Sequence, residues 1–316
     1  MSRAFGRPKM LSEATVERVR QVAAELGYMP NQVARALSTG RHTNIAIVVP
    51  DIANPFFPPL IRAVQAGADA SGFSVFLGDS DEDAEREQTL VQRLAVQVEG
   101  FILASSRMPD LQIQDLAARR PVVLVNRDTA GLCRVLIDTA AGIDAAVAHL
   151  AQLGHTSLVY VSGPAASWSD QQRRSAIRRA TNRYKVSVKS VAASRPTFES
   201  GQSVAAAVLD CGATAAITFD DLVAHGLLAR LLETGVKVPE EFSVIGCDDV
   251  LGASTYPALT SVSARCDEAG KIAVELLMSA LNTGQESDVR CVLETRLVIR
   301  ATTAQAKARK ARRGTR

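Results

Sequence analysis

Residues 44–50 read NIAIVVP, a short apolar run that ends at a proline. A run of this length and composition predicts a buried strand. It opens a series in which strand patterns alternate with helical ones and the connections are short. The strands of this first series are expected at 44–50, 73–78, 100–104, 121–126 and 134–137, with helices near 59–71, 83–98, 110–119 and 140–153.

A second series of the same kind follows. Its strands are expected at 157–162, 186–191, 214–219, 242–247 and 292–299, with helices near 168–182, 199–210, 220–234 and 266–283. Such alternation predicts parallel sheets that are covered by helices on both faces. Two successive series predict two lobes, with a ligand cleft beyond the carboxyl ends of the strands. The predicted fold class is therefore α/β, with two doubly wound parallel sheets behind a small helical head.

The residues before the first strand form this small basic head. Residues 12–26 read as one helix, with Ser12 as its N-cap and Gly27 as its stop signal. Nothing else in the head would cover the apolar stripe of that helix, which consists of Val16, Val19, Val22, Ala23 and Leu26. Residues 30–41 follow as a helix-capable segment that is too short to stay helical alone in water. We therefore expect this segment to order only when another molecule holds it.

The charge is unevenly distributed along the chain. The formal net charge is +3, but residues 1–43 carry +4 and residues 301–316 carry +6, which leaves −7 for the rest. An acidic body with basic ends suggests that the ends, and not the body, meet a polyanion such as DNA. For the C-terminal tail, the alternative is a charged end that is only solvated and disordered.

Composition and missing motifs exclude several classes of protein. Of the 316 residues, 47% are hydrophobic, which is enough for sizeable cores. The five cysteines are scattered, and this pattern argues against a zinc site or a disulfide scaffold and fits the cytoplasm. Neither a membrane-length apolar run nor a secretory signal is seen, so we expect no membrane partner. Phosphate loops, dinucleotide turns, nucleophile elbows and metal-spaced histidines are also missing. We therefore expect no enzyme, no cofactor and no metal.

Eight short motifs occur in a fixed order along the chain. They lie at residues 12–15, 25–31, 54–57, 149–155, 220–226, 238–240, 243–249 and 257–260. In order and spacing they resemble the lactose-repressor/galactose-repressor (LacI/GalR) family over about residues 2–303. The resemblance implies a helix-turn-helix head, a hinge helix that folds in the DNA minor groove, and a two-lobed core like that of periplasmic binding proteins.

The resemblance also divides the chain into parts. These are a helix-turn-helix remnant (1–29), a hinge helix and linker (30–43), an effector-binding core (44–303) and a basic disordered tail (304–316). Within the core, the first lobe is expected at about 44–161 and 264–290, and the second at about 162–261 and 291–303. The chain opens inside the second helix of the family motif, so we expect the natural start to lie further upstream. A truncated reading frame is the alternative.

The resemblance assigns DNA contacts to the head and to the hinge. The expected residues are Ser2, Arg3, Asn31, Gln32, Ala34, Arg35 and Leu37. The arginines would donate to phosphates, a contribution to binding that depends on salt and hardly on sequence. Leu37 would enter a base step as an apolar wedge and kink the duplex. Ordinary packing between domains is the alternative role for Leu37.

Candidate effector contacts lie just past strand ends and at the start of one helix. Phe56 and Phe57 follow the first strand, and their rings could stack on a planar base or on a sugar face. The alternative is packing between the lobes, and we expect one of the two rings to have only that role. Arg173 lies one turn into a helix that Trp168 opens, and the resemblance makes it a forked donor to the ligand. The remaining contacts implied by the resemblance are Asn126, Ser169, Phe198, Asp220 and Asp248. Asp220 stands where the family more commonly has asparagine.

These patterns favour a ligand-responsive regulator of transcription, expected to be a repressor. It would bind a palindromic operator as a homodimer and respond to a small effector, a sugar or a related metabolite. The alternative from another class is a periplasmic-type sugar-binding protein of a transporter, which shares the two-lobed fold. A sugar-modifying enzyme is a third interpretation, and the lack of a catalytic constellation counts against it.

Overall fold

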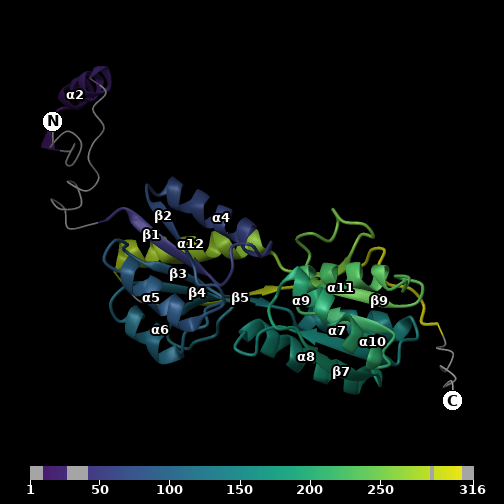
Figure 1. Cartoon of the computed structure of the whole chain (residues 1–316). Coiled ribbons are helices and arrows are strands. Elements are labelled where there is room, and N and C mark those ends of the chain that lie inside the picture. The colour runs from purple at the N-terminus through teal and green to yellow at the C-terminus, as the bar shows by residue number, and fades with distance from the viewer. Residues whose placement is uncertain (1–9, 27–41, 285–287, 308–316) are drawn as a thin grey trace, which may run out of the picture.

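The computed structural model describes residues 10–26, 42–284 and 288–307. Figure 1 shows a short helix apart from two lobes that lie end to end. That helix, α2 (Glu13–Glu25), confirms the helix predicted in the head. Ser12 is its N-cap, and its side chain accepts a hydrogen bond from the main-chain N–H of Thr15. Of the predicted apolar stripe, Val16 and Ala23 are buried, whereas Val22 and Leu26 are exposed.

The first lobe is built on a six-stranded parallel sheet in the order β11-β5-β4-β3-β1-β2. Its strands are β1 (Asn44–Val49), β2 (Ser74–Asp79), β3 (Phe101–Ala104), β4 (Val122–Val125), β5 (Cys133–Asp138) and β11 (Arg290–Glu294). One face packs against α4 (Phe57–Ala70) and α12 (Cys266–Thr283), and the other against α5 (Ala84–Leu94) and α6 (Asp110–Ala117). In Figure 1, α12 lies beside α4, although some 200 residues of chain separate the two helices.

The second lobe is built on another six-stranded sheet, in the order β12-β10-β9-β8-β6-β7, in which only β12 is antiparallel to its neighbour. Its strands are β6 (Ser157–Ser162), β7 (Ser187–Ala192), β8 (Ala215–Thr218), β9 (Ser243–Asp248), β10 (Thr260–Ser263) and β12 (Leu297–Val298). One face packs against α7 (Ala140–Gln152) and α8 (Trp168–Tyr184), and the other against α9 (Phe198–Ser203), α10 (Ala205–Asp210) and α11 (Asp221–Glu233). The predicted fold class, two lobes with doubly wound sheets, is confirmed.

The division between the lobes differs from the expected one. Residues 140–161 were expected in the first lobe, but α7 packs on α8 and β6 lies inside the second sheet. The predicted strand 292–299 is in fact two strands, because β11 pairs with β5 in the first sheet and β12 pairs with β10 in the second. The chain therefore crosses between the lobes near residues 139, 264 and 295. The crossings lie close together, and the Thr295 hydroxyl donates to the main-chain oxygen of Asp138 at 3.0 Å.

No helix within the described residues is long and apolar enough to cross a membrane.

Two glycines let α9 and α11 touch at their backbones. A Cβ added at Gly226 would overlap the carbonyl oxygen of Phe198, and a Cβ added at Gly201 would overlap that of Val223. Because the obstructing atoms belong to the main chain, a larger side chain at either position would have to push the two helices apart.

Gly226→Ala is therefore expected to lower the free energy of unfolding by about 1–3 kcal/mol, the usual range for overpacking. Urea titration followed by circular dichroism would measure this change. Leu232→Ala is a matched control on the same helix, since Leu232 is 77% exposed and its loss should change stability by less than about 0.5 kcal/mol. Equal stability of the two variants would contradict the close helix contact.

Candidate functional site

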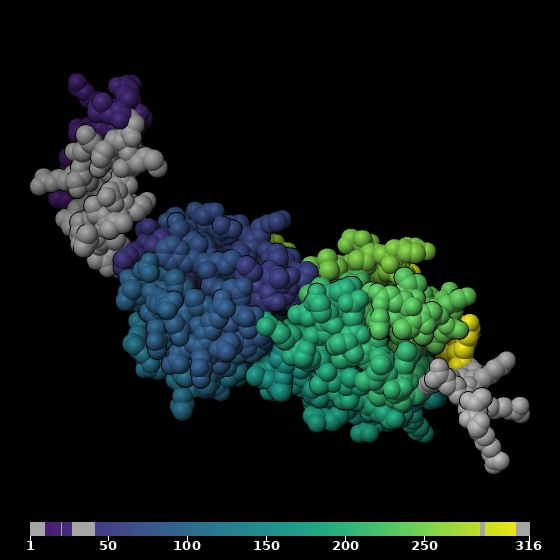
Figure 2. Space-filling view, viewed as in Figure 1, coloured from purple at the N-terminus to yellow at the C-terminus, as the bar shows by residue number. Residues whose placement is uncertain are grey.

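A cavity lies between the two lobes, at the carboxyl ends of their strands. With the lobes in contact as they are in this structure, its free volume is only about 30 Å³. The first lobe lines it with Asn54, Phe56, Phe57, Glu82, Ser105, Arg107 and Asn126, and the second lobe with Ser167, Ser169, Arg173, Pro196, Phe219 and Asp248. We call this space the interlobe cavity. Figure 2 shows the lobes as two masses that meet across a narrow waist.

Arg173 is the central cation of the second-lobe wall. Ser167 caps α8 by accepting from the N–H of Asp170, and the helix then carries Arg173 to the cavity. The guanidinium is buried, donates to Asp248 Oδ1 at 3.0 Å and to the carbonyl of Phe219, and lies 4.8 Å from the Phe219 ring centre. Its Nε has no hydrogen-bond partner among the described residues. A buried donor of this kind is costly unless something accepts from it, so a bound molecule would fit here.

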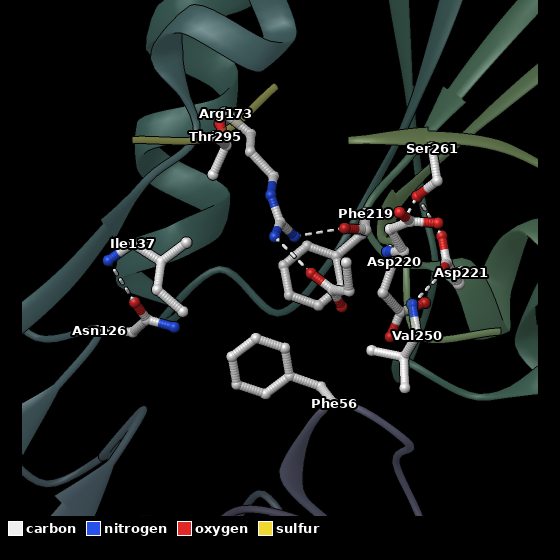
Figure 3. Close-up of polar contacts among 12 residues, drawn as sticks. Phe56, Asn126, Ile137, Arg173, Phe219, Asp220, Asp221, Val250, Ser261 and Thr295 are labelled. Atoms are coloured by element: carbon white, nitrogen blue, oxygen red, sulfur yellow. Dashed lines mark hydrogen bonds and ion pairs between the residues drawn. The ribbon is translucent and has the colours of Figure 1, made fainter. Parts of the chain in front are cut away.

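Two polar side chains are held at the cavity by left-handed backbone at strand ends. Asp248 ends β9 with φ 102°, and Asn126 follows β4 with φ 54°. Burial raises the pKa of Asp248, and the neighbouring Arg173 partly offsets this effect. Asn126 Oδ1 accepts from the N–H of Ile137 at 3.0 Å. In Figure 3 the amide nitrogen of Asn126 points toward the centre of the site as a remaining donor.

Aromatic rings supply the apolar part of the cavity. Phe56 and Phe57 are both buried at the start of α4, with ring centres 5.0 Å apart and an edge-to-face angle of 80°. Asn54 fixes this turn, because its Oδ1 accepts from the N–H of Phe56 at 3.0 Å. Phe219 enters from the other lobe, and Figure 3 shows its ring and that of Phe56 on the same side of the Arg173 guanidinium. Apolar faces and polar groups from both lobes therefore converge on one space.

Comparison with known proteins places this geometry in a family. Residues 147–303 match the model of a periplasmic binding protein-like domain. The chain is 30% identical over 312 residues to the HTH-type transcriptional repressor CytR of Escherichia coli, with 96% of this chain and 92% of the relative covered. It is 31% identical over 317 residues to catabolite control protein A of Streptococcus mutans, with 96% and 93% covered. The chain belongs to the LacI family of transcriptional regulators.

Solved structures of LacI-family regulators match the fold. The lac repressor dimer bound to operator and the anti-inducer ONPF matches with a TM-score of 0.84 at 26% identity, over 96% of this chain and 94% of that one. A LacI-family regulator from Enterococcus faecium with bound ribose gives 0.75 at 27% identity, over 84% and 100%. A complex of the regulator CelR with cellobiose gives 0.74 at 26% identity, over 95% and 94%.

Of the eight expected effector contacts, six line the interlobe cavity: Phe56, Phe57, Asn126, Ser169, Arg173 and Asp248. Phe198 does not line it. Its main-chain carbonyl lies against Gly226 at the contact between α9 and α11, and its role as an effector contact stays a prediction.

Asp220 does not line the cavity either, and its side chain lies at the start of α11. It caps α11 by accepting from the N–H of Val223 at 2.8 Å, and its other oxygen accepts from Asn54 Nδ2 at 2.9 Å across the lobes. Burial raises its pKa to about 7, with a further contribution from Asp248. The Asp220 carboxylate therefore links the two lobes through the hydrogen bond that it accepts from Asn54.

A second contact between the lobes lies outside the cavity. Arg195, which follows β7, forms an ion pair with Asp81, which follows β2, and also donates to the carbonyl of Asp81 at 3.3 Å. Both side chains are about half exposed, so the pair itself contributes little stability. Together with the Asn54–Asp220 bond, it means that the lobes are in direct polar contact in this structure.

Several cavity residues carry no motif or resemblance that predicted them, including Glu82, Ser105, Arg107 and Phe219. Arg107 could have been found by the rule that identified Asn126, because it comes shortly after a predicted strand, 100–104. Glu82 lies in a loop with no pattern of its own, and only the folded chain brings it to Arg107.

The DNA-contact residues expected for the LacI family lie outside the described residues. These are Ser2, Arg3, Asn31, Gln32, Ala34, Arg35 and Leu37. Their roles stay predictions. Within the residues that the structure describes, no group of three or more His, Cys, Asp or Glu side chains is arranged to hold a metal ion.

Proposed function

We propose that this regulator is a homodimeric repressor whose binding to a palindromic operator is controlled by a small neutral metabolite, a sugar or a related compound, in the interlobe cavity. The observation that carries the proposal is the composition of the cavity wall. Side chains from both lobes converge there, among them the Arg173–Asp248 pair and the rings of Phe56 and Phe219. A molecule that contacts both walls stabilises one relative arrangement of the lobes over others.

The coupling to DNA would pass through the first lobe. Its β1 is the first strand after the head and hinge segment, and the β1–α4 turn carries Asn54 and Phe56 to the cavity. A ligand that changes how these residues meet the second lobe would move the surfaces from which the two hinge segments of a dimer emerge. The ligand can shift this equilibrium only through its different affinities for the two arrangements.

The relatives support the choice of a sugar over other metabolites and of a regulator over a transport protein. The structures described for related regulators contain ribose and cellobiose. The relatives that cover 96% of this chain are a transcriptional repressor and a catabolite control protein, and the match includes most of the head. A binding protein of a transporter would not need that head.

Selection of genomic DNA fragments by the purified protein, followed by footprinting, would test the proposal. We expect protection of a two-fold symmetric site, with an affinity that falls as salt rises because phosphate contacts release counterions. Sugars and nucleosides would then be screened for an effect on that affinity. Protein that selects no site, or a site whose affinity no cavity ligand changes, would contradict the proposed function.

Leu37→Ala is expected to weaken operator binding at least tenfold, which corresponds to about 1.4 kcal/mol. An apolar side chain that wedges a base step contributes only to the kinked, specific complex. Binding to unrelated DNA, which depends on phosphate contacts, and effector affinity should both stay within a factor of two or so of wild type.

Fluorescence anisotropy on operator and non-operator duplexes would measure the specificity ratio, and a thermal melt without DNA would serve as the control. If Leu37 only packs between domains, the variant would melt at a lower temperature and keep its specificity ratio. That outcome would rule out the role of Leu37 as a wedge between base pairs.

A further inference from the structure

A groove on the second lobe runs between α8 and the edge strand β7. Figure 1 shows these two elements side by side on the outer side of that lobe. The groove has a free volume of about 390 Å³, and it shares no lining residue with the interlobe cavity. Its main lining residues are Arg174, Ile177 and Arg178 of α8, residues 187–190 of β7, and Tyr160 and Val186. We call it the α8–β7 groove.

One side of the β7 main chain has no strand beside it. β7 is the last strand in the order of the second sheet, and among the described residues it pairs only with β6. The N–H of Ser187 donates to the carbonyl of Thr156, just before β6, at 2.9 Å. Because successive residues of a strand turn their main chain to opposite sides, the N–H and C=O groups of Val188 and Ser190 point away from β6. This free edge can accept a further strand.

β7 lacks the features that commonly protect a free edge. It contains no proline, and its register with β6 runs from Ser187 to Ala192 without a bulge. Its one charged residue is Lys189, whose ammonium group donates to the carbonyl of Cys211 at 2.9 Å. Cys211 follows α10 on the opposite face of the sheet, so this lysine does not close the side that faces α8.

The floor of the α8–β7 groove is apolar. Tyr160, Ile177 and Val186 are buried there, and Val188 is half-buried. A strand that paired with β7 would direct every second side chain toward α8. An apolar side chain at one of these positions would cover the floor, which is how added strands gain specificity beyond their main-chain hydrogen bonds.

The α8 wall of the groove is positively charged. Residues 170–190 hold seven Lys or Arg and one Asp, a net charge of +6, although residues 44–300 together carry −7. Arg174 lines the groove but is already paired with buried Asp170. Arg178 also lines it, is exposed, and forms no ion pair with any residue that the structure describes. An acidic side chain would complement this wall.

We propose that the α8–β7 groove binds an acidic, extended segment of a partner protein, which adds to β7 as a further strand and places a carboxylate against Arg178. The same helix thus carries Arg173 to the interlobe cavity and Arg178 to the surface that meets the partner. Nucleic acid is the other polyanion to consider. It would supply neither a main chain that pairs with the free edge nor an aliphatic side chain for the floor.

Fluorescence anisotropy of the full chain with a labelled peptide tests the proposal. The probe reads Thr-Glu-Thr-Val-Thr-Glu-Thr, with both glutamates and the valine on one face, and it reads the same in both directions. We expect it to bind about tenfold more tightly than the same peptide with glutamine in place of glutamate. N-methylation of alternate residues should abolish binding in one of the two possible sets only, because only one set donates to β7. No binding, or equal binding of the glutamine peptide, would overturn the proposal.

Charge reversal at Arg178 separates this site from general attraction. Arg178→Glu should weaken probe binding at least tenfold. Arg179→Glu is the matched control, because this neighbour is exposed on the same helix and does not line the groove, and it should change affinity by about a factor of two or less. Equal losses in the two variants would show that only net charge attracts the probe, and would overturn the proposal.

Substitution of Ser190 tests the free edge. Ser190→Pro removes an outward N–H and should weaken probe binding, whereas Ser190→Ala keeps that N–H and should not. Circular dichroism checks that the variants are folded. A folded Ser190→Pro protein with wild-type affinity would contradict strand addition.

Two further measurements decide between occupants. If Arg178→Glu lowers affinity for duplex DNA of random sequence but not for the peptide, the surface contacts nucleic acid. If it changes the molecular mass in light scattering, the surface joins copies of this chain. Either result would overturn the proposal. Operator and effector binding should stay at wild-type levels in Arg178→Glu, so the proposed function does not depend on this outcome.

Discussion

Arg173→Ala is expected to weaken effector binding about 100-fold. The substitution removes a buried guanidinium whose Nε has no partner among the described residues and which orients Asp248 at 3.0 Å. Hydrogen bonds to charged groups contribute about 1.5–3 kcal/mol each, and about 1.4 kcal/mol is a factor of ten in affinity. Loss of one or two such bonds to the ligand gives the expected change, which calorimetry would measure with the compound found in the screen.

The control for Arg173→Ala must take account of Asp248, the ion-pair partner of Arg173. Without Arg173, Asp248 is left buried and unpaired, its pKa rises further, and the second lobe loses stability. Arg173→Ala combined with Asp248→Asn removes that penalty and should restore much of the melting temperature but not the affinity. Arg178→Ala, an exposed change on the same helix, should leave both unchanged. Wild-type affinity in a folded Arg173→Ala protein would remove this residue from the site.

Asp220→Asn is expected to stabilise the protein increasingly as the pH rises from 5 to 8. Burial raises the pKa of Asp220 to about 7 and that of the adjacent Asp221 to about 8, with repulsion from Asp248 as the next cause in both. An Asp whose folded-state pKa is raised binds more protons in the folded than in the unfolded protein. Its stabilising contribution is therefore complete below about pH 4 and is lost as the pH rises through 7.

An asparagine cannot ionise, so the free energy of unfolding of the variant relative to wild type should grow by roughly 2–3 kcal/mol over this pH range. The comparison with wild type is needed because burial, full for His155 and partial for His149 and His225, lowers the pKa values of these histidines, and their effect on stability has the opposite sign. Urea titrations at pH 5, 6, 7 and 8 would give the difference.

Asp210→Asn is the matched control, since this carboxylate is exposed on α10 of the same lobe and its replacement should give a difference that does not vary with pH. An Asp220→Asn protein whose advantage over wild type is the same at pH 5 and pH 8 would show that Asp220 is ionised throughout. At pH 5 the variant should be slightly less stable, because the amide does not reproduce both acceptor bonds, to Val223 and to Asn54.

Local patterns were sufficient to predict most elements of this chain. The helix predicted at 266–283 is α12 with the same bounds, and Ser12 caps α2 as expected. These features depend on residues within one or two turns of each other, on the period of apolar side chains and on hydrogen bonds to nearby N–H groups. The alternation of strands and helices also predicted two doubly wound sheets, because few arrangements bury such elements.

Site residues at strand ends could be located in part. The rule that parallel strands present their carboxyl ends at one edge, together with the resemblance to the LacI family, identified Arg173, Asp248 and Asn126. The same rule also selected Asp220, whose side chain caps α11 and does not line the cavity. A residue after a strand can serve the next helix or the cavity, and the sequence pattern is the same in both cases.

Only the tertiary structure decided what depends on partners far away in the chain. The segment expected as one strand at 292–299 divides between two sheets, because its pairing is with β5 and β10 and not with its neighbours in sequence. The bond from Asn54 to Asp220 spans 166 residues, and the Glu82–Arg107 pair spans 25. No local propensity encodes such contacts. They form because packing of apolar faces brings the strand ends together, and the composition of the cavity wall is a consequence of that packing.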